Sequence, residues 1–451
     1  MDKDSGLSSQ TDGGKALEPP PAVLEIARTL IRAGHESWFV GGAVRDALLG
    51  YPNLDWDLAT AATPQQVQRL FRRTVPVGID FGTVGVLDDA GTMHEVTTFR
   101  RDVLTDGRHA VVEFGASLDE DLARRDFTIN AIAYGPDSRV LHDPFHGRTD
   151  LAHRLVRAVG VAEDRMREDR LRALRAIRFA ARFRFTIETD TWSAILSSAP
   201  HLGRLSMERV QQEIEKTMTQ VELPGEAFRL WRDSGAFAVL APPLAASSDL
   251  ALATLDRLPR ARSAAQSDRT SNRLTALVLE LPPALARDTL RELRFSNDRI
   301  RWIGDLVERW HALAPAIRDS LLAGAPPPDA TVRRWVAGTG RTRVSAFLRV
   351  AEARFAAEFA EGGRVAPSAA IRSLYRRMSR AAFRDPVEIG DLAIGGGDLM
   401  KAGIEAGPRL GAVLRALLEW VLDDPARNTH DRLLARAREL AREFAREQSH
   451  D

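Results

Sequence analysis

The hydrophobic pattern of this chain changes near residue 160, and the change restricts the folds that it can adopt. Before that point, short alternating segments such as Ser37–Val40 and Thr83–Leu87 indicate β-strands, and Ala22–Ala33 repeats apolar residues at helical spacing. After it, strand signals nearly vanish, and segments such as Glu163–Phe183 and Leu410–Leu422 indicate helices. The pattern predicts an α+β fold, in which a small mixed sheet with helices is followed by helical domains.

The length of the chain predicts several domains. A chain of 451 residues is too long for one compact core, so about two to four domains are expected. Residues 1–20 are polar and rich in glycine, serine and proline, and we expect a disordered leader without the apolar segment of a signal peptide. The first structured domain is expected at residues 21–160, and helical domains at residues 161–224, 225–330 and 331–451.

Composition excludes several kinds of chemistry. The chain has no cysteine, which rules out disulfides, thiolate metal sites and thiol catalysis and is compatible with the cytoplasm, where we expect it to act. No apolar run of about 18 residues occurs, so no membrane-spanning helix is expected. Net charge is only +1, but residues 331–385 hold twelve arginines against four acidic residues, and Arg372, Arg376 and Arg377 lie near one helix face. An RNA-binding face and an ordinary solvated face both explain this region.

A Gly-Gly turn ending at Gly42, followed by a predicted helix and then by two aspartates, suggests a nucleotide site. The turn lets the backbone approach a ligand, free N–H groups at the helix start suit a triphosphate, and Arg45 adds a charged fork. Asp55 and Asp57 are expected on one side of a strand, where they offer the oxygen ligands that Mg²⁺ requires. Two Mg²⁺ ions bridged by this pair would activate a hydroxyl and stabilise leaving pyrophosphate. Glu95, on a neighbouring predicted strand, offers a third carboxylate.

Each part of this pattern also has an ordinary structural explanation. An isolated pair of aspartates at this spacing is usually a turn or surface feature, and Glu95 alone is compatible with a surface strand. The order of the Gly-Gly turn, the arginine and the aspartates is more specific than any one of them.

Two further clusters carry charged residues at informative spacings. In the first, Arg125 is expected to meet a triphosphate, while Asp126 and Asn130 orient a ribose hydroxyl or support the loop. A structural cluster of ion pairs is the alternative interpretation.

The second cluster is expected on one helix, where residues three apart share a face. Asp169 accepts hydrogen bonds and Arg172 donates them, so this pair can read the Watson–Crick edge of a base. Arg175 and Arg178 continue the same polar stripe and are expected to reach phosphates.

The motifs between about residues 37 and 217 resemble the class II tRNA nucleotidyltransferase and bacterial poly(A) polymerase family. They stand in family order: VGGAVRDALLG, LDWDLAT, HEVTTFRRD, DGRHAVVEF, DEDL, RRDFTINAIAY, DPFHGRTDL, EDRLRALRAIRFAARF and SMERVQQEIEK. The later stretches LRFSNDRI and DLAIGGGDLMKAGIEAGPRLGAVLRALLEWVL are similar to body and tail segments of bacterial CCA-adding members. The resemblance covers most of the chain, though thinly between residues 240 and 285.

The resemblance implies a polymerase-β-like nucleotidyltransferase head followed by all-helical neck, body and tail domains at the boundaries given above. It implies metal binding by Asp55 and Asp57. It also implies nucleotide contacts from Gly42, Arg45, Arg125, Asp169, Arg172, Arg175 and Arg178. Residues 100–109 match a flexible loop that helps the switch from CTP to ATP, with Gly107 as a hinge. No histidine lies between His201 and His311, so the phosphohydrolase domain of some relatives is not expected.

The implied reaction is addition of C, C and A to the 3′ end of tRNA from CTP and ATP, with release of pyrophosphate. The implied partners are NTPs and the 3′ end and acceptor arm of tRNA, with neither a membrane nor an obligate protein partner. A poly(A) polymerase shares every head motif, and an enzyme that adds only CC or only A also remains open. Extended bacterial poly(A) polymerases tend to end in a long basic tail. This chain instead has a mixed acidic and basic helix at Asp431–Gln448, which favours CCA addition. A catalytically silent RNA-binding module is disfavoured because all the charged residues of these motifs are present.

Overall fold

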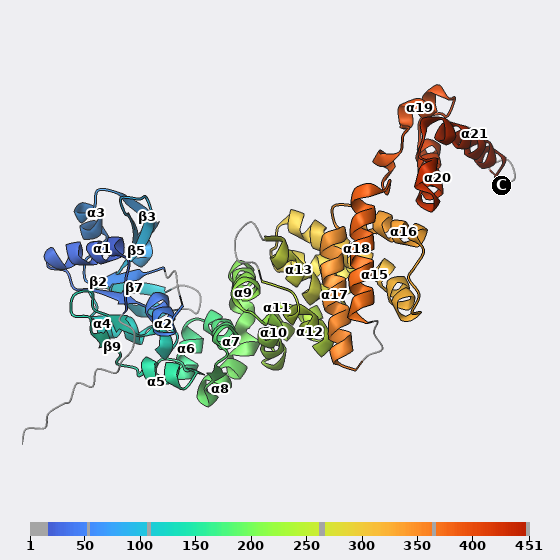
Figure 1. Ribbon diagram of the computed structural model, residues 1–451. Helices are drawn as coiled ribbons and strands as arrows, with labels where there is room; N and C mark the ends of the chain where they lie inside the picture. Colours follow the sequence, from blue (N-terminus) through green and yellow to red (C-terminus); the bar gives the residue numbers. More distant parts are fainter. Residues whose placement is uncertain (1–16, 52–54, 106–109, 261–266, 363–366, 448–451) are drawn as a thin grey trace, which may run out of the picture. The chain divides into compact units, whose positions relative to one another are not determined.

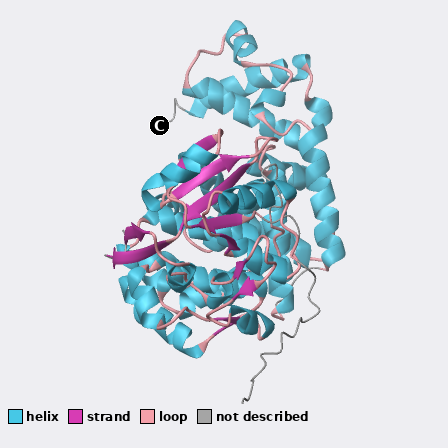
Figure 2. Cartoon of the chain, turned by 90° about the vertical axis from the view of Figure 1, so that its left-hand side faces the viewer, coloured by secondary structure: helices cyan, strands magenta, loops and turns pink. Residues whose placement is uncertain are grey.

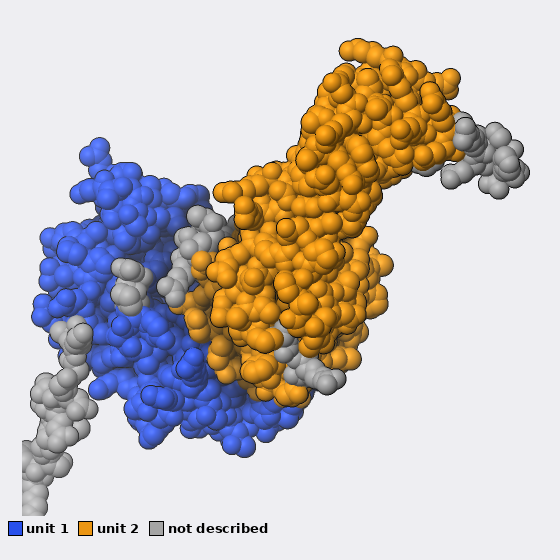
Figure 3. Space-filling view, turned by 45° about the vertical axis from the view of Figure 1, so that its right-hand side comes forward, with its two compact units in different colours: residues 1–206 blue, residues 207–451 orange. Residues whose placement is uncertain are grey.

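The computed structural model describes residues 17–51, 55–105, 110–260, 267–362 and 367–447. The chain divides into two compact units, Met1–Ser206 and Met207–Asp451, which are coloured separately in Figure 3. Most of the expected leader at residues 1–20 and the expected hinge Gly107 lie outside the described residues. The finer domain boundaries near residues 160, 224 and 330 stay predictions.

The first unit is built on a seven-stranded mixed sheet with strand order β3-β4-β5-β2-β1-β8-β9. Within it, β2 and β5 pair in parallel and the other neighbours pair antiparallel. The strands of this sheet are β1 (Ser37–Val40), β2 (Asp57–Thr60), β3 (Thr74–Gly78), β4 (Thr83–Leu87), β5 (Met93–Thr98), β8 (Ala133–Tyr134) and β9 (Leu141–His142). A separate hairpin consists of β6 (Arg100–Thr105) and β7 (Ala110–Phe114), and a short parallel pair of β10 (Leu155–Val156) and β11 (Thr186–Ile187).

The expectation that Asp55 lies on the same strand as Asp57 is wrong, because β2 begins at Asp57. β2 pairs with β1, and Val40 faces Asp57 at the end of that ladder. The chain leaves β1 at Val40 and turns through Gly41, so β1 offers no partner for the exposed Asp55.

Helices accompany the sheet in the first unit, and α3 shows why they begin where they do. The Thr63 hydroxyl oxygen accepts a hydrogen bond from the backbone N–H of Gln66, the Gln66 side-chain oxygen accepts one from the backbone N–H of Thr63, and Pro64 occupies the first turn. The helices are α1 (Pro21–Arg32), α2 (Gly42–Leu48), α3 (Pro64–Leu70), α4 (Leu118–Ala123), α5 (Gly147–Ala152), α6 (Ala162–Glu168), α7 (Leu171–Phe183) and α8 (Thr189–Ser198), with 3₁₀ turns η1 (Ile79–Phe81), η2 (Thr128–Asn130) and η3 (Ala199–Arg204).

The single helix predicted at Glu163–Phe183 is wrong, because the chain breaks between α6 and α7. Asp169 has extended backbone angles, φ −145° and ψ 106°, and its Oδ1 accepts a hydrogen bond from the Leu171 amide at 3.0 Å. A side chain that caps a new helix competes with continuation of the previous one. An aspartate shortly before an apolar helical run is a start signal that could have revealed this break.

The second unit is helical throughout its described residues, and every described strand belongs to the first unit (Figures 1 and 2). This confirms the predicted fold class. Its helices are α9 (Met207–Gln220), α10 (Pro224–Asp233), α11 (Ala236–Leu240), α12 (Asp249–Asp256), α13 (Ser267–Val278), α14 (Pro283–Glu292), α15 (Asn297–Leu322), α16 (Asp329–Thr339), α17 (Val344–Ala360), α18 (Ser368–Arg384), α19 (Gly396–Lys401), α20 (Pro408–Asp423) and α21 (His430–Glu447). No helix among the described residues has the length and apolar character needed to cross a membrane.

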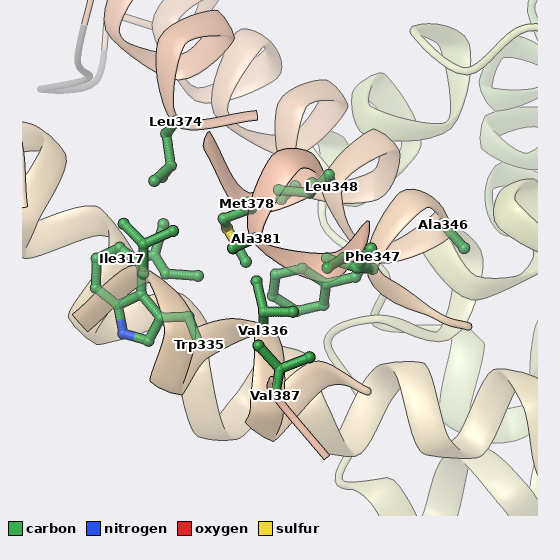
Figure 4. Packing of buried hydrophobic residues seen from close by; sticks show 14 of the residues in the cluster. Ile317, Trp335, Val336, Ala346, Phe347, Leu348, Leu374, Met378, Ala381 and Val387 are labelled. Carbon is green, nitrogen blue, oxygen red and sulfur yellow. The ribbon is translucent and has the colours of Figure 1, made fainter. Parts of the chain in front are cut away.

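Packing in the second unit fixes which side of α18 faces solvent. Leu374, Met378 and Ala381 of α18 are buried in one cluster with Trp335 of α16 and Phe347 of α17 (Figure 4). These positions repeat at helical spacing, so the opposite side of α18 carries the polar residues.

Candidate active site

The charges of two further acids, Glu95 and Asp55, act on Asp57 where β2 and β5 run side by side. These strands place Leu58 opposite Val96, so Asp57 and Glu95, one residue earlier on each chain, lie next to each other. Burial raises the pKa of Asp57 to about 7, with further contributions from the negative charges of Glu95 and Asp55. Carboxylate charge is therefore concentrated at this edge of the β2–β5 pair.

The chemistry of these carboxylates fits a divalent cation. Across the described ranges, no three His, Asp or Glu side chains lie close enough together to hold a metal ion as they stand. Burial is the main cause of the raised pKa of Asp57, but the repulsion that Glu95 and Asp55 add is what a bound cation would relieve, and Mg²⁺ prefers carboxylate oxygens. Asp55 and Asp57 remain predicted metal ligands, and Asp55, Asp57 and Glu95 remain predicted catalytic residues.

The turn before α2 brings an arginine close to these acids. Gly41 has φ 74° and ψ −133°, a conformation that favours glycine. A Cβ built on Gly41 would lie only 2.8 Å from Nη1 of Arg125, so the absence of a side chain also admits this guanidinium. The charge of Arg125 opposes the rise in the pKa of Asp57. Arg125 therefore lies near both the turn and the acids, whereas Gly42, the glycine named from the sequence, begins α2.

Arg45 is buried rather than projected toward solvent. Only 3% of the residue is exposed, and its guanidinium lies 4.9 Å and 4.8 Å from the ring centres of Phe179 and Phe183 on α7. Its Nε donates to Asp46 at 2.7 Å, and its Nη1 donates to Oδ1 of Asn130. Burial lowers the pKa of Arg45, and Asp46 partly offsets this effect.

Asp126 and Asn130 connect the loop after α4 to α7. The Asn130 amide donates to Oδ1 of Asp126 at 2.8 Å, and Arg175 donates through Nε to Oδ2 of Asp126 at 2.8 Å. Burial opposes ionisation of Asp126, but Arg175 and Asn130 outweigh it and lower its pKa to about 2. These contacts favour support of the loop over contact with a ribose, and the roles of both residues stay predictions.

The arginines of α7 are also engaged with the protein. Arg172 is 9% exposed and donates to Glu168 at 2.6 Å and to the carbonyls of Arg165 and Arg124 at 3.0 Å and 2.9 Å. Arg178 is 3% exposed and lies 4.3 Å from the ring centre of Phe179. Arg172, Arg175 and Arg178 share α7, but the expectation that Asp169 belongs to the same helical stripe is wrong, because α7 begins at Leu171.

The structure reveals acidic partners to which the sequence assigned no role. Asp121 is 1% exposed and accepts hydrogen bonds from Arg124 and Arg125, both at 3.0 Å. Its spacing of three and four residues from these arginines is a usable signal for pairing. Asp46 accepts from Arg45 and from Arg182, which is 136 residues away, and no local pattern reveals that second contact.

Comparison with known families matches two parts of the chain. The model of the poly A polymerase head domain matches residues 37–157. The model described as the probable RNA and SrmB-binding site of polymerase A matches residues 184–247. The mixed sheet and the acids of β2 and β5 lie within the head-domain match, and together with the full-length relatives described next they define the class of the protein, which is a nucleotidyltransferase.

Relatives over the full length narrow this class. The CCA-adding enzyme of Geobacillus kaustophilus (strain HTA426) is 36% identical, with 93% of this chain and 97% of the relative covered. That of Latilactobacillus sakei subsp. sakei (strain 23K) is 35% identical, with 92% and 97% covered. The chain belongs to the family of CCA-adding enzymes, which confirms the resemblance seen in its motifs.

Solved structures agree with this assignment. The crystal structure of the Bacillus stearothermophilus CCA-adding enzyme in complex with CTP has a TM-score of 0.73 and 33% identity, covering 96% of this chain and 100% of that chain. The Thermotoga maritima CCA-adding enzyme complexed with tRNA has a TM-score of 0.65 at 22% identity, covering 94% and 96%, and supports the fold alone.

Proposed function

We propose that this protein adds C, C and A to the 3′ end of tRNA, taking nucleotides from CTP and ATP and releasing pyrophosphate. The observation that carries the proposal is the full-length similarity to CCA-adding enzymes, including one bound to CTP. Incubation with labelled CTP and ATP and a tRNA lacking its 3′ CCA tests it. Both labels are expected to enter the RNA, and incorporation of neither would overturn the proposal.

The acids on β2 and β5 are proposed to support the chemical step. Asp55 and Asp57, with Glu95 beside Asp57, would hold two Mg²⁺ ions, which when bound activate the RNA 3′ hydroxyl and stabilise leaving pyrophosphate. Arg125 would orient the triphosphate, because it lies between the Gly41 turn and the acids and a guanidinium pairs well with phosphate oxygens.

The α7 region is proposed to select the base. Asp169 and Arg172 would pair with the base edge, while Arg175 and Arg178, on the same helix, would contact the phosphates of the nucleotide. Arg172 already donates to Glu168, so a base that uses this donor has to replace that contact. Residues 100–109 are proposed to help the change from CTP to ATP; of these, Arg100–Thr105 form β6, paired with β7. Action in the cytoplasm stays a prediction.

The outer side of α18 is proposed to bind tRNA phosphates. Arg372, Arg376, Arg380 and Arg384 are exposed there. Within the described part of the chain, none of these four forms an ion pair or a hydrogen bond. Phe383 is 74% exposed beside Arg380 and Arg384 and lines a surface hollow with them. Free guanidinium groups in a row suit a phosphate backbone.

Arg377, grouped with this face from the sequence, belongs elsewhere. It donates to the carbonyl of Pro327 at 2.6 Å and pairs with Asp329. The sequence grouped Arg377 with Arg372 and Arg376, but the third arginine of this exposed face is Arg380.

Charge reversal of Arg372, Arg376 and Arg380 to Glu is expected to weaken tRNA binding. Because each lost phosphate contact lowers the salt dependence of log affinity by about 0.7–0.9, the loss of three contacts should flatten the salt slope by about 2 to 3. The KM for tRNA should rise by about 10-fold or more, while the KM for CTP changes little. Steady-state kinetics at several salt concentrations measure both effects.

A matched control keeps the charge change and moves it to other helices of the same unit. Arg257, Arg291 and Arg301 are exposed, and their joint reversal to Glu is expected to leave the salt slope near that of the wild type. Equal loss of tRNA affinity in both triple variants would assign the effect to net charge rather than to α18.

A further inference from the structure

Asp46 is the shared counter-ion of two arginines that come from different elements. It lies on α2, and its Oδ1 accepts hydrogen bonds from Arg45 through Nε at 2.7 Å, with Nη2 at 2.5 Å. Its Oδ2 accepts from Nη2 of Arg182 on α7 at 2.8 Å. The side chains of Asp46, Arg45 and Arg182 are 13%, 4% and 23% exposed. Both carboxylate oxygens are therefore used in a largely buried setting.

Arg45 depends on this carboxylate because its other surroundings are mainly apolar. The stacked rings of Phe179 and Phe183 lie on one side of its guanidinium, and burial lowers the pKa of Arg45. A buried cation is destabilised when its anionic partner is removed, because the remaining charge is left uncompensated. Asp46 thus determines whether Arg45 can stay against the two rings.

The same face of α7 forms a second contact with neighbouring elements, through Arg175. Arg175 pairs with Asp126 at 2.7 Å, and Asp126 is connected through Asn130 to Arg45. Arg175 and Arg182 are seven residues apart, two helical turns, with the ring of Phe179 between them. One alternating chain of charged and amide groups therefore joins α2, η2 and α7.

We propose that Asp46 and Arg182 are positioning residues that lock α2 to α7 and hold Arg45 in place. The inference deepens the proposed function and rests on it, because α2 follows the turn at the triphosphate and α7 carries the arginines assigned to the nucleotide. When these ion pairs are formed, α2 and α7 are held together as one rigid assembly, which contacts the bound nucleotide at both its triphosphate and its base. Neither residue takes part in bond making or breaking.

Asp46→Asn tests the proposal, because it keeps the shape of the side chain and removes its charge. The KM for CTP and the KM for ATP are both expected to rise by about 10- to 100-fold, the range typical of losing a group that orients a metal ligand. The KM for tRNA should stay unchanged. The fold-decrease in kcat should be smaller than the fold-increase in the KM for the nucleotides. Asp46→Glu restores the charge and is expected to recover part of the affinity.

Arg182→Gln gives a second, independent measurement on a more exposed partner. It is expected to raise the same two KM values less than Asp46→Asn does. In the double variant, the fold-increase in each nucleotide KM should be smaller than the product of the two single-variant increases, because both changes break the same contact. The exposed pair formed by Asp137 and Arg28 in the same unit provides the control, and Asp137→Asn should leave every KM unchanged.

The outcomes separate this inference from the function on which it rests. A wild type that extends no tRNA would refute the proposed function itself. An active wild type with unchanged nucleotide KM in Arg182→Gln, or with equal losses for tRNA and nucleotides, would overturn the positioning role. If Asp46→Asn does not fold, the Arg182→Gln and Arg182→Lys pair still decides the question through the KM values.

Discussion

Replacement of Asp55 or Asp57 by Ala is expected to abolish incorporation of both CTP and ATP while tRNA binding stays near that of the wild type. Bound metal ions contribute several kcal/mol to a phosphoryl transfer, and each 1.4 kcal/mol changes a rate about 10-fold. Loss of either carboxylate should therefore lower kcat by at least about 1,000-fold for each nucleotide. Single-turnover assays with each nucleotide, together with a tRNA binding titration, measure the two effects separately.

The position of these acids explains why both nucleotides should be affected. Asp57 lies beside Glu95 on the parallel β2–β5 pair, and repulsion among the acids contributes to its raised pKa. A site that serves the triphosphate is common to CTP and ATP, whereas a site that reads the base is not.

Two comparisons make the result specific. Asp89 is an exposed acid of the same sheet region, and Asp89→Ala should behave as the wild type does. Loss of incorporation of only one nucleotide in Asp55→Ala or Asp57→Ala would instead make these residues elements of base selection.

Asp169→Ala and Arg172→Ala are expected to relax the choice among nucleotides. A bidentate contact to a base edge contributes about 1–3 kcal/mol of discrimination, which corresponds to about 5- to 150-fold. UTP and GTP should therefore enter the RNA at a larger fraction of the CTP and ATP rates. Competition assays with all nucleotides, read by sequencing the products, measure that fraction.

The contacts of Arg172 require a control for structural damage. This side chain also supports the carbonyls of Arg124 and Arg165, so Arg172→Ala is expected to lower stability as well. Arg167, an exposed neighbour on α6 that pairs with Asp164, supplies the matched replacement Arg167→Ala, which should preserve selectivity. Uniformly slower addition with unchanged preference would move Asp169 and Arg172 to a structural role.

Local patterns were sufficient for many elements of the fold. β1 and β4 have the predicted bounds, because alternation of side chains along a strand is visible in a few residues. The helix predicted at Leu410–Leu422 lies within α20 because the helical period is equally visible there. The break at Asp169 was missed because a helix interior and a helix start both accept an aspartate, and only the cap on Leu171 separates them.

The candidate site depended more on contacts distant in sequence. The spacing of Asp55 and Asp57 is local, but their neighbour Glu95 is brought in by the parallel register of β2 and β5. The burial of Arg45 required knowledge of α7, because an arginine near a glycine turn is equally compatible with solvent. Arg273 makes the same point: it is fully buried and donates to carbonyls that include Met218 and Leu258, yet its sequence context resembles a surface helix.

The central claim is CCA addition, and the product formed on a tRNA transcript that lacks its 3′-terminal CCA tests it most directly. With all common NTPs present, the wild type is expected to give one product, extended by C, C and A in that order and then no further. High-resolution gels and sequencing of the new 3′ end read this outcome. A ladder of A-only extensions, on that tRNA or on an unstructured oligonucleotide, would contradict the account and identify a poly(A) polymerase, and a product ending after CC would identify a partial enzyme.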